Sequence, residues 1–381
     1  MLPASEADSL PLRVTRSCLW NRCRYCTIYR GQAFSIRSEE EIFADIEWVA
    51  RLAEAVRCKT GGAIGGTHTT SLDVPSLARS FPTAADGVSR IVVERWLAGN
   101  SRRAFLQDAD ALVCPIQSLV RILKRLRDGL PEVQKVVTFA STRTLLELSR
   151  ARGSLEALHA AGLNKVLVGV ESGSNRVLHA MNKGCTSEEH IEACRCAIEA
   201  GLEVGCYVMP GLGGLALTEE HGAATSRVIR EIRPHQVLLR MLYCDPTSDL
   251  EERRLRGEFR LLEAAEVVQE IRTFLRGIAD TTTEIESSYD GNLIPELQGR
   301  IDMHAARFDQ LCEAFLSLPQ ATQDAYTVAR RIGAVANLAV AQSTPRALDI
   351  FVAIAANLRA RSGGRLEVGL GGNLLRSKTS H

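Results

Sequence analysis

The sequence predicts an α/β protein, a partial (β/α)6 barrel of the TIM type followed by a helical C-terminal extension. Short apolar runs alternate with segments of helical periodicity between residues 104 and 244, which is typical of repeated βαβ units and a parallel sheet. One more apolar run, at 12–15, brings the expected strands to six, fewer than the eight of a closed barrel. After about residue 250 the alternation ends and helical segments dominate.

The expected strands are apolar runs bounded by turn signals. They are residues 12–15, 104–110, 135–141, 165–172, 203–211 and 235–244. The segments of helical periodicity between them are 116–128, 143–161, 187–201 and 218–232. In such folds the loops that follow the carboxyl ends of the strands carry the chemistry, so functional residues are expected there.

A further helix is expected at residues 38–57. Ser38 can cap its first turn, and Glu41 follows three residues later, which is the spacing of a capping box. The glycine-rich run that begins at residue 61 lacks the GK[ST] ending of a phosphate-binding loop and predicts a plain connection. The segment 91–99 predicts a strand or a short helix.

We expect two domains. Residues 1–250 form the partial barrel, and residues 251–381 form a mainly helical extension. Residues 281–299 are polar and rich in turn-forming residues, so no strand is expected there. The scattered Gly and Ser of residues 361–381 predict a flexible tail.

The composition argues against several classes of protein. The chain has 46 Lys and Arg against 45 Asp and Glu, and this balance argues against a general binder of nucleic acid or membrane surfaces. No apolar stretch approaches the roughly 18 residues of a membrane span, and the N-terminus lacks a secretory signal. Eleven cysteines, an odd number, favour a reducing compartment. We therefore expect a cytoplasmic protein that binds neither nucleic acid nor membranes.

Three cysteines follow the first expected strand within nine residues: Cys18, Cys23 and Cys26. Thiolates are soft ligands that suit zinc or iron–sulfur clusters. A structural zinc usually takes a fourth nearby ligand, and the sequence offers no second pair. The spacing therefore favours a [4Fe–4S] cluster with one open iron. A zinc loop with a distant fourth ligand, or three buried thiols, remains the alternative.

This loop, C-x4-C-x2-C with Tyr25 before the last cysteine, resembles the C-x3-C-x2-C motif of the radical S-adenosylmethionine (radical SAM) superfamily. Residues 162–184 resemble the family's fourth-strand region, and residues 199–214 resemble the following helix, strand and glycine-rich turn. Residues 104–112 lie where many members carry a Gly-Gly-Glu-like sequence, but this chain differs there. The resemblance covers about residues 12–245.

The resemblance implies a cofactor set and a reaction. The three cysteines would hold a [4Fe–4S] cluster whose open iron binds the amino and carboxylate groups of S-adenosylmethionine (SAM). One electron from the reduced cluster would break a C–S bond and generate a carbon radical, usually 5′-deoxyadenosyl, that acts on a small-molecule substrate. A reducing partner such as flavodoxin or ferredoxin would supply the electron.

The resemblance also implies SAM contacts at the strand ends. They are Tyr25, Asp108, Ser141, Glu171, Ser172, Met209 and Gly211. For Asp108 and Asp110 the alternative is a helix cap. Arg176 and Lys183 could bind a carboxylate, but charges on a helix surface are the expected interpretation.

Two other functions stay open. The longer first gap of the cysteine motif and the altered second-strand loop are compatible with cleavage of a different SAM bond and transfer of a 3-amino-3-carboxypropyl group. A non-catalytic iron–sulfur or zinc protein on the same fold is the alternative from another class, and a zinc hydrolase is the third option.

Overall fold

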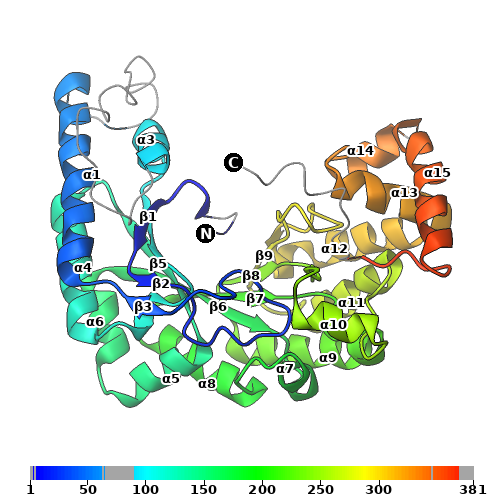
Figure 1. Cartoon of the computed structure of the whole chain (residues 1–381), viewed down its shortest axis with the longest axis horizontal. Helices are drawn as coiled ribbons and strands as arrows, with labels where there is room; N and C mark the ends of the chain where they lie inside the picture. Colours follow the sequence, from blue (N-terminus) through cyan, green and yellow to red (C-terminus); the bar gives the residue numbers. More distant parts are fainter. Residues whose placement is uncertain (1–2, 4–5, 62–63, 65–89, 345, 369–381) are drawn as a thin grey trace. The chain divides into compact units, whose positions relative to one another are not determined.

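The computed structural model describes residues 3, 6–61, 64, 90–344 and 346–368 (Figure 1). Its main feature is an eight-stranded, mostly parallel sheet in the order β1-β4-β5-β6-β7-β8-β9-β10, with helices between the strands in the chain. The α/β fold class is therefore confirmed. None of the helices in these ranges is long and apolar enough to cross a lipid bilayer.

Six strands of the sheet match the six that the sequence predicts. They are β1 (Leu10–Arg13), β4 (Arg103–Gln107), β5 (Lys135–Ala140), β6 (Leu163–Glu171), β7 (Glu203–Val208) and β8 (Gln236–Leu239). The sheet has two further strands, β9 (Glu284–Glu286) and β10 (Gly299–Arg300). They lie in and at the end of the segment 281–299, where no strand is expected. β9 pairs parallel to β8 and antiparallel to β10. Both are too short and polar to give an apolar run.

The chain divides into two compact units that interleave along the sequence. The first unit comprises Met1–Asn21, Gly31–Gly169 and Ala193–Val204. The second unit comprises Arg22–Arg30, Val170–Glu192 and Gly205–His381. The domain boundary expected at residue 250 stays a prediction.

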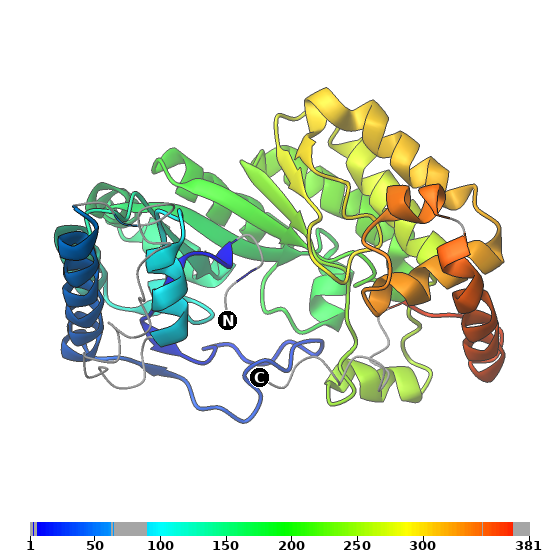
Figure 2. The same ribbon diagram turned by 90° about the horizontal axis from the view of Figure 1, so that it is seen from above.

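In the part of the chain that the structure describes, the first unit holds β1, β4, β5 and most of β6, together with five helices. These helices are α1 (Glu39–Thr60), α3 (Arg90–Ala98), α4 (Ile116–Gly129), α5 (Thr142–Arg150) and α6 (Ser154–Ala161). Figure 2 shows the blue α1 and the cyan α3 side by side. The expected capping box is present at the start of α1, where Ser38 accepts from the Glu41 amide and Glu41 accepts from the Ser38 amide.

In the first unit, one expected helix is divided into two, and the structure settles the type of one segment that the sequence leaves open. The single helix expected at 143–161 is split into α5 and α6, because Gly153 takes a left-handed conformation with φ 78°. The segment expected to be a strand or a short helix is the helix α3. Most of the glycine-rich connection that begins at residue 61 lies outside the described residues.

The second unit holds the end of β6, most of β7, the strands β8–β10 and most of the remaining helices. The helices are α7 (Asn175–Ala180), α9 (Gly214–Ile232), α10 (Asp249–Leu255), α11 (Ala264–Gly277), α12 (Ile301–Leu316), α13 (Gln320–Arg331), α14 (Leu338–Ser343) and α15 (Arg346–Arg361). The helix α8 (Ser187–Glu199) begins in this unit and ends in the first. The helix α11 packs against both α9 and α12 (Figure 1).

The chain after α15 returns to the start of α11. The Val368 amide donates to the Leu262 carbonyl, and Glu263 and Glu367 form a β-bridge. This part of the expected flexible tail is therefore held by backbone hydrogen bonds. The rest of the tail, residues 369–381, lies outside the described residues.

Candidate active site

The cysteine loop begins and ends in a small antiparallel sheet of the first unit. The strand β2 (Thr15–Arg16) leads into the loop, and β3 (Ser35–Ile36) leads out of it. At the entrance, the Ser17 amide donates to Asp108 Oδ2 at 3.1 Å, and the Asp108 amide donates to Thr15 Oγ1 at 3.1 Å. Asp108, an expected SAM contact, is buried and holds the start of the loop.

Cys18 lies in the part of the loop that belongs to the first unit. Its thiol is free and half-buried, and its Sγ accepts a hydrogen bond from the Asn21 amide at 3.4 Å. The neighbouring Trp20 lies under the Arg143 guanidinium, whose carbon is 4.7 Å from the ring centre.

Cys23 and Cys26 lie in the second unit and form a turn, in which the Cys26 amide donates to the Cys23 carbonyl at 3.1 Å. Between them, Arg24 fixes the loop to its surroundings. Its amide donates to the Met181 carbonyl at 3.0 Å, and its guanidinium donates to the Ala180 carbonyl at 2.6 Å. Arg24 therefore holds the loop against the end of α7, and no pattern in the sequence indicates this role.

The three cysteines carry the residue types that an iron–sulfur cluster needs. All three are half-buried and outside disulfides, and sulfur is the ligand that such clusters prefer. Across the residues that the structure describes, no three His, Cys, Asp or Glu side chains form a group that could hold a metal ion. The donor chemistry fits the cluster, and shared binding by all three cysteines stays a prediction.

Glu171 ends β6 with a left-handed backbone conformation, φ 62°, and faces an ammonium group. Its Oε1 lies 3.3 Å from Lys183 Nζ, which in turn lies 3.4 Å from the Tyr25 hydroxyl. Burial raises the pKa of Tyr25, so its phenol stays protonated. Burial opposes the charge on Lys183, but the negative charge around it, that of Glu171 included, outweighs that effect and holds its pKa above the ordinary value. The three side chains form a charged and polar cluster at the end of β6.

The expectation that Lys183 is a surface charge is therefore wrong. Asn182 and Gly184, on either side of it, both have positive φ values, so the chain reverses after α7 and turns Lys183 inward. Arg176, by contrast, is exposed and pairs with Glu220 at 2.6 Å, as expected for a helix-surface charge.

Ser172, Met209 and Gly211 are tied to the protein by hydrogen bonds. Ser172 Oγ lies 2.8 Å from His221 Nδ1, and His221 Nε2 lies 3.1 Å from the Met209 carbonyl oxygen. The Met209 amide donates to the Glu171 carbonyl at 3.0 Å, which joins the ends of β6 and β7. Gly211 has φ 87°, and its amide donates to Glu270 Oε1 at 2.6 Å.

Asp110 and Ser141 act as helix caps in the first unit. Asp110 Oδ1 accepts from the Leu112 amide, and Oδ2 accepts from the Ser141 amide at 2.9 Å and from Thr144 Oγ1 at 2.7 Å. Burial raises the pKa of Asp110, although these hydrogen bonds oppose that shift. Ser141 Oγ accepts from the Thr144 amide at the start of α5. The capping interpretation of Asp110 is confirmed, and a SAM contact by Ser141 stays a prediction.

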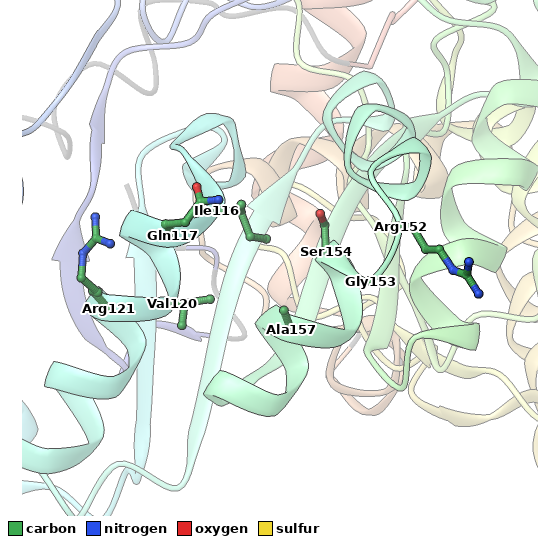
Figure 3. A pocket seen from close by; sticks show the side chains of 8 residues that line it. All are labelled: Ile116, Gln117, Val120, Arg121, Arg152, Gly153, Ser154 and Ala157. Carbon is green, nitrogen blue, oxygen red and sulfur yellow. The ribbon is translucent and has the colours of Figure 1, made fainter.

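A hollow on the first unit lies between α4 and α6 (Figure 3). Its lining residues are Ile116, Gln117, Val120, Arg121, Arg152, Gly153, Ser154 and Ala157. None of them is an expected site residue, and Arg121 is bound to Glu39. This hollow is not part of the candidate active site.

Comparison with solved structures finds similar folds at low sequence identity. Coproporphyrinogen III oxidase (HemN) from Escherichia coli is 16% identical with a TM-score of 0.44, covering 71% of this chain and 52% of its own. An archaeal Elp3 from Methanocaldococcus infernus is 17% identical with a TM-score of 0.41, covering 55% and 54%. Methylornithine synthase is 12% identical with a TM-score of 0.42, covering 73% and 65%. The chain thus spans about half the length of the first two.

A comparison with curated proteins found no match. The family model of the radical SAM superfamily, however, matches residues 12–221, more than half of the chain. The matched range includes the cysteine loop, Glu171 and the turn after β7. This chain belongs to the radical SAM superfamily, whose members bind a [4Fe–4S] cluster and SAM.

Proposed function

We propose that the chain is an enzyme that cleaves SAM reductively with a [4Fe–4S] cluster and directs the resulting carbon radical, usually 5′-deoxyadenosyl, at a small-molecule metabolite. One observation carries this proposal. Three half-buried cysteines that form no disulfide stand in a C-x4-C-x2-C loop after the first strands, inside the range that the family model matches.

When bound, the reduced cluster supplies the electron that breaks a C–S bond of SAM. Cys18, Cys23 and Cys26 would be its thiolate ligands. The two halves of the loop are fixed separately, since Asp108 holds its entrance and Arg24 its second turn. Each anchor limits the motion of its own part of the loop and of the cysteines in that part.

Glu171 and Lys183 have the chemistry to bind the amino group and the carboxylate of an amino acid. On binding the open iron, the SAM amino group would keep N–H donors and the SAM carboxylate would keep an accessible oxygen, and the chain offers a carboxylate and an ammonium 3.3 Å apart. Glu171 could then accept from the amino N–H groups and Lys183 could pair with the carboxylate, and neither side chain would give up a backbone hydrogen bond. Tyr25, Met209 and Gly211 would complete the binding surface near the adenosine.

Partners follow from the chemistry. The electron requires a reductant such as flavodoxin or ferredoxin. None of the eleven cysteines forms a disulfide in the described residues, which fits a reducing, cytoplasmic setting. A balanced charge and the lack of a recognised nucleic-acid module in the sequence favour a small molecule over nucleic acid as substrate.

The test is anaerobic reconstitution with iron and sulfide, followed by dithionite and SAM, with the adenosine products identified by mass spectrometry. We expect 5′-deoxyadenosine, and we expect Cys23→Ala to abolish it. Cys58→Ala is the matched control, because Cys58 is exposed on α1, outside the loop. Methylthioadenosine in place of 5′-deoxyadenosine would instead support 3-amino-3-carboxypropyl chemistry. A colourless protein that makes neither product would contradict both and favour a zinc or structural role.

A further inference from the structure

Glu270 is a buried carboxylate of α11 that lies beyond the range matched by the family model. Its Oε1 accepts from the Gly211 amide at 2.6 Å, and its Oε2 accepts from Thr218 Oγ1 at 2.5 Å. His221 Nε2 lies 3.7 Å from Oε1. All four residues belong to the second unit.

Glu270 lies among apolar side chains, where a charged carboxylate is energetically unfavourable. The buried face of α11 is otherwise apolar, with Val267, Val268, Ile271 and Phe274. A carboxylate in such a position is unfavourable unless hydrogen bonds compensate for lost water, and a hydrophobic side chain would fill the space at lower cost. Packing alone therefore does not account for Glu270.

The helices α9 and α11 pack against each other beside Glu270. Gly222 of α9 faces α11, and a Cβ there would lie 3.4 Å from the Glu270 carbonyl oxygen and 3.5 Å from its Cγ. These are ordinary van der Waals distances, so alanine would fit at this position without moving α11. In this packing the Glu270 carboxylate lies within hydrogen-bond distance of the Gly211 amide.

The turn 209–211 is held by hydrogen bonds from several elements. The Met209 amide donates to Glu171, and the Met209 carbonyl accepts from Leu212 and His221. The Pro210 carbonyl accepts from the Leu242 amide at 2.9 Å, and the Gly211 carbonyl accepts from Gly214. Within this turn, Gly211 N–H is the one amide whose acceptor is a side chain, so its position depends on Glu270.

We propose that Glu270 is a positioning residue for SAM binding, which rests on the proposed function of the turn 209–211. Through the Gly211 amide it holds the left-handed conformation that ends β7 and presents Met209 to the ligand. His221 acts on the same turn from its carbonyl side and ties it to Ser172 at the end of β6. The helix α11 thereby determines the shape of a binding surface formed by residues far earlier in the chain.

The test compares Glu270→Ala with Glu270→Gln. The alanine variant leaves the buried Gly211 amide without an acceptor, whereas the glutamine amide oxygen can replace Oε1. Asp309→Ala is the matched control, because Asp309 of α12 also binds α11, through Arg272 and Arg276, but makes no contact with the turn. If the alanine variant does not fold, Thr218→Val removes only the hydroxyl that donates to Oε2 and should give a smaller change in the same direction.

Two readouts separate positioning from general stability. The first is hydrogen–deuterium exchange in peptides covering residues 209–213 of the unloaded protein, and the second is the SAM dissociation constant of the reconstituted protein. We expect Glu270→Ala to raise both the exchange rate and the dissociation constant about tenfold. Glu270→Gln should stay within about twofold of the unchanged protein, and Asp309→Ala should lower only the melting temperature.

The proposal is overturned if Glu270→Ala leaves exchange and SAM affinity unchanged, or if glutamine is as damaging as alanine. Failure of the proposed function gives a different result. In that case the unchanged protein binds no SAM, which removes the ligand part of the proposal, while the exchange comparison still decides whether Glu270 holds the turn.

Discussion

Carboxylates at the strand ends are used differently in the two units. In the first unit, Asp108 and Asp110 accept hydrogen bonds from backbone amides and so hold loops and helix starts. In the second unit, Glu171 is paired with the side-chain ammonium of Lys183. A side-chain ion pair can open for a ligand, whereas a backbone cap cannot be released without loss of local structure. We therefore expect the aspartates to stabilise local structure and Glu171 to exchange its partner for a ligand, while a SAM contact by Asp108 stays a prediction.

The largest effect is expected for Asp110→Ala. The change removes the cap of the 111–113 turn and leaves the Ser141 amide and the buried Thr144 hydroxyl without their shared acceptor. Together these losses should lower the free energy of unfolding by about 3 kcal/mol, as measured by urea denaturation. Glu171→Gln removes the negative charge beside the buried Lys183 but keeps an acceptor for it, so it should lower the free energy of unfolding by less, about 2 kcal/mol. Equal losses in the two variants would contradict the comparison.

A pH-dependent effect is expected at His190, near the end of β6. Burial, followed by the charge on Lys183, lowers the pKa of this histidine to about 3, while its ring hydrogen-bonds to the backbone of Val170. The unfolded chain takes up a proton near pH 6.5, but the folded chain does not until about pH 3. Stability is therefore lost as the pH falls through this window, by about 1.4 kcal/mol per pH unit at most.

At pH 5 the loss from His190 should reach about 2 kcal/mol. The measurement is the free energy of unfolding against pH for the unchanged protein and for His190→Gln, which has no titrating ring. The unchanged protein should show the steeper decline between pH 6.5 and 4. Parallel curves for the two proteins would show that His190 titrates normally in the folded state.

Much of the fold follows from the sequence because buried parallel strands are continuous apolar runs. The strands expected at 203–211 and 235–244 nevertheless run past the observed ends of β7 and β8, at Val208 and Leu239. The residues beyond those ends, such as Met209 and Leu242, are also buried, so hydrophobicity continues into the loops. An apolar run therefore locates a strand better than it locates the end of that strand.

The candidate site was harder to predict, for two physical reasons. Lys183 looks like a surface charge until the turn at Asn182 directs it inward. Glu270 looks like the polar face of an amphipathic helix, and only the tertiary contact with Gly211 reveals its role. In both cases a local pattern misleads, because the partner is distant in sequence or depends on an unusual backbone conformation.

The smallest change in free energy is expected for SAM binding when the Glu171–Lys183 pair is broken. It is also the change most specific to the proposed function. Lys183→Met removes the ammonium that we propose for the SAM carboxylate and leaves Glu171 without this partner. We expect the SAM dissociation constant of the reconstituted protein to rise about tenfold, which corresponds to about 1.4 kcal/mol. Equilibrium dialysis with radiolabelled SAM measures it directly.

Lys183→Arg and Arg176→Met complete this experiment. Arginine keeps the positive charge and should recover part of the affinity, although its planar group suits a different geometry. Arg176 is an exposed charge that pairs with Glu220, so its loss should leave SAM binding unchanged. If Lys183→Met and the wild-type protein bind SAM equally well, this ion pair does not contact SAM. Its role would then be to hold the cysteine loop through Tyr25. The distinction between exchangeable and structural charges at the strand ends would then fail at the pair that motivates it.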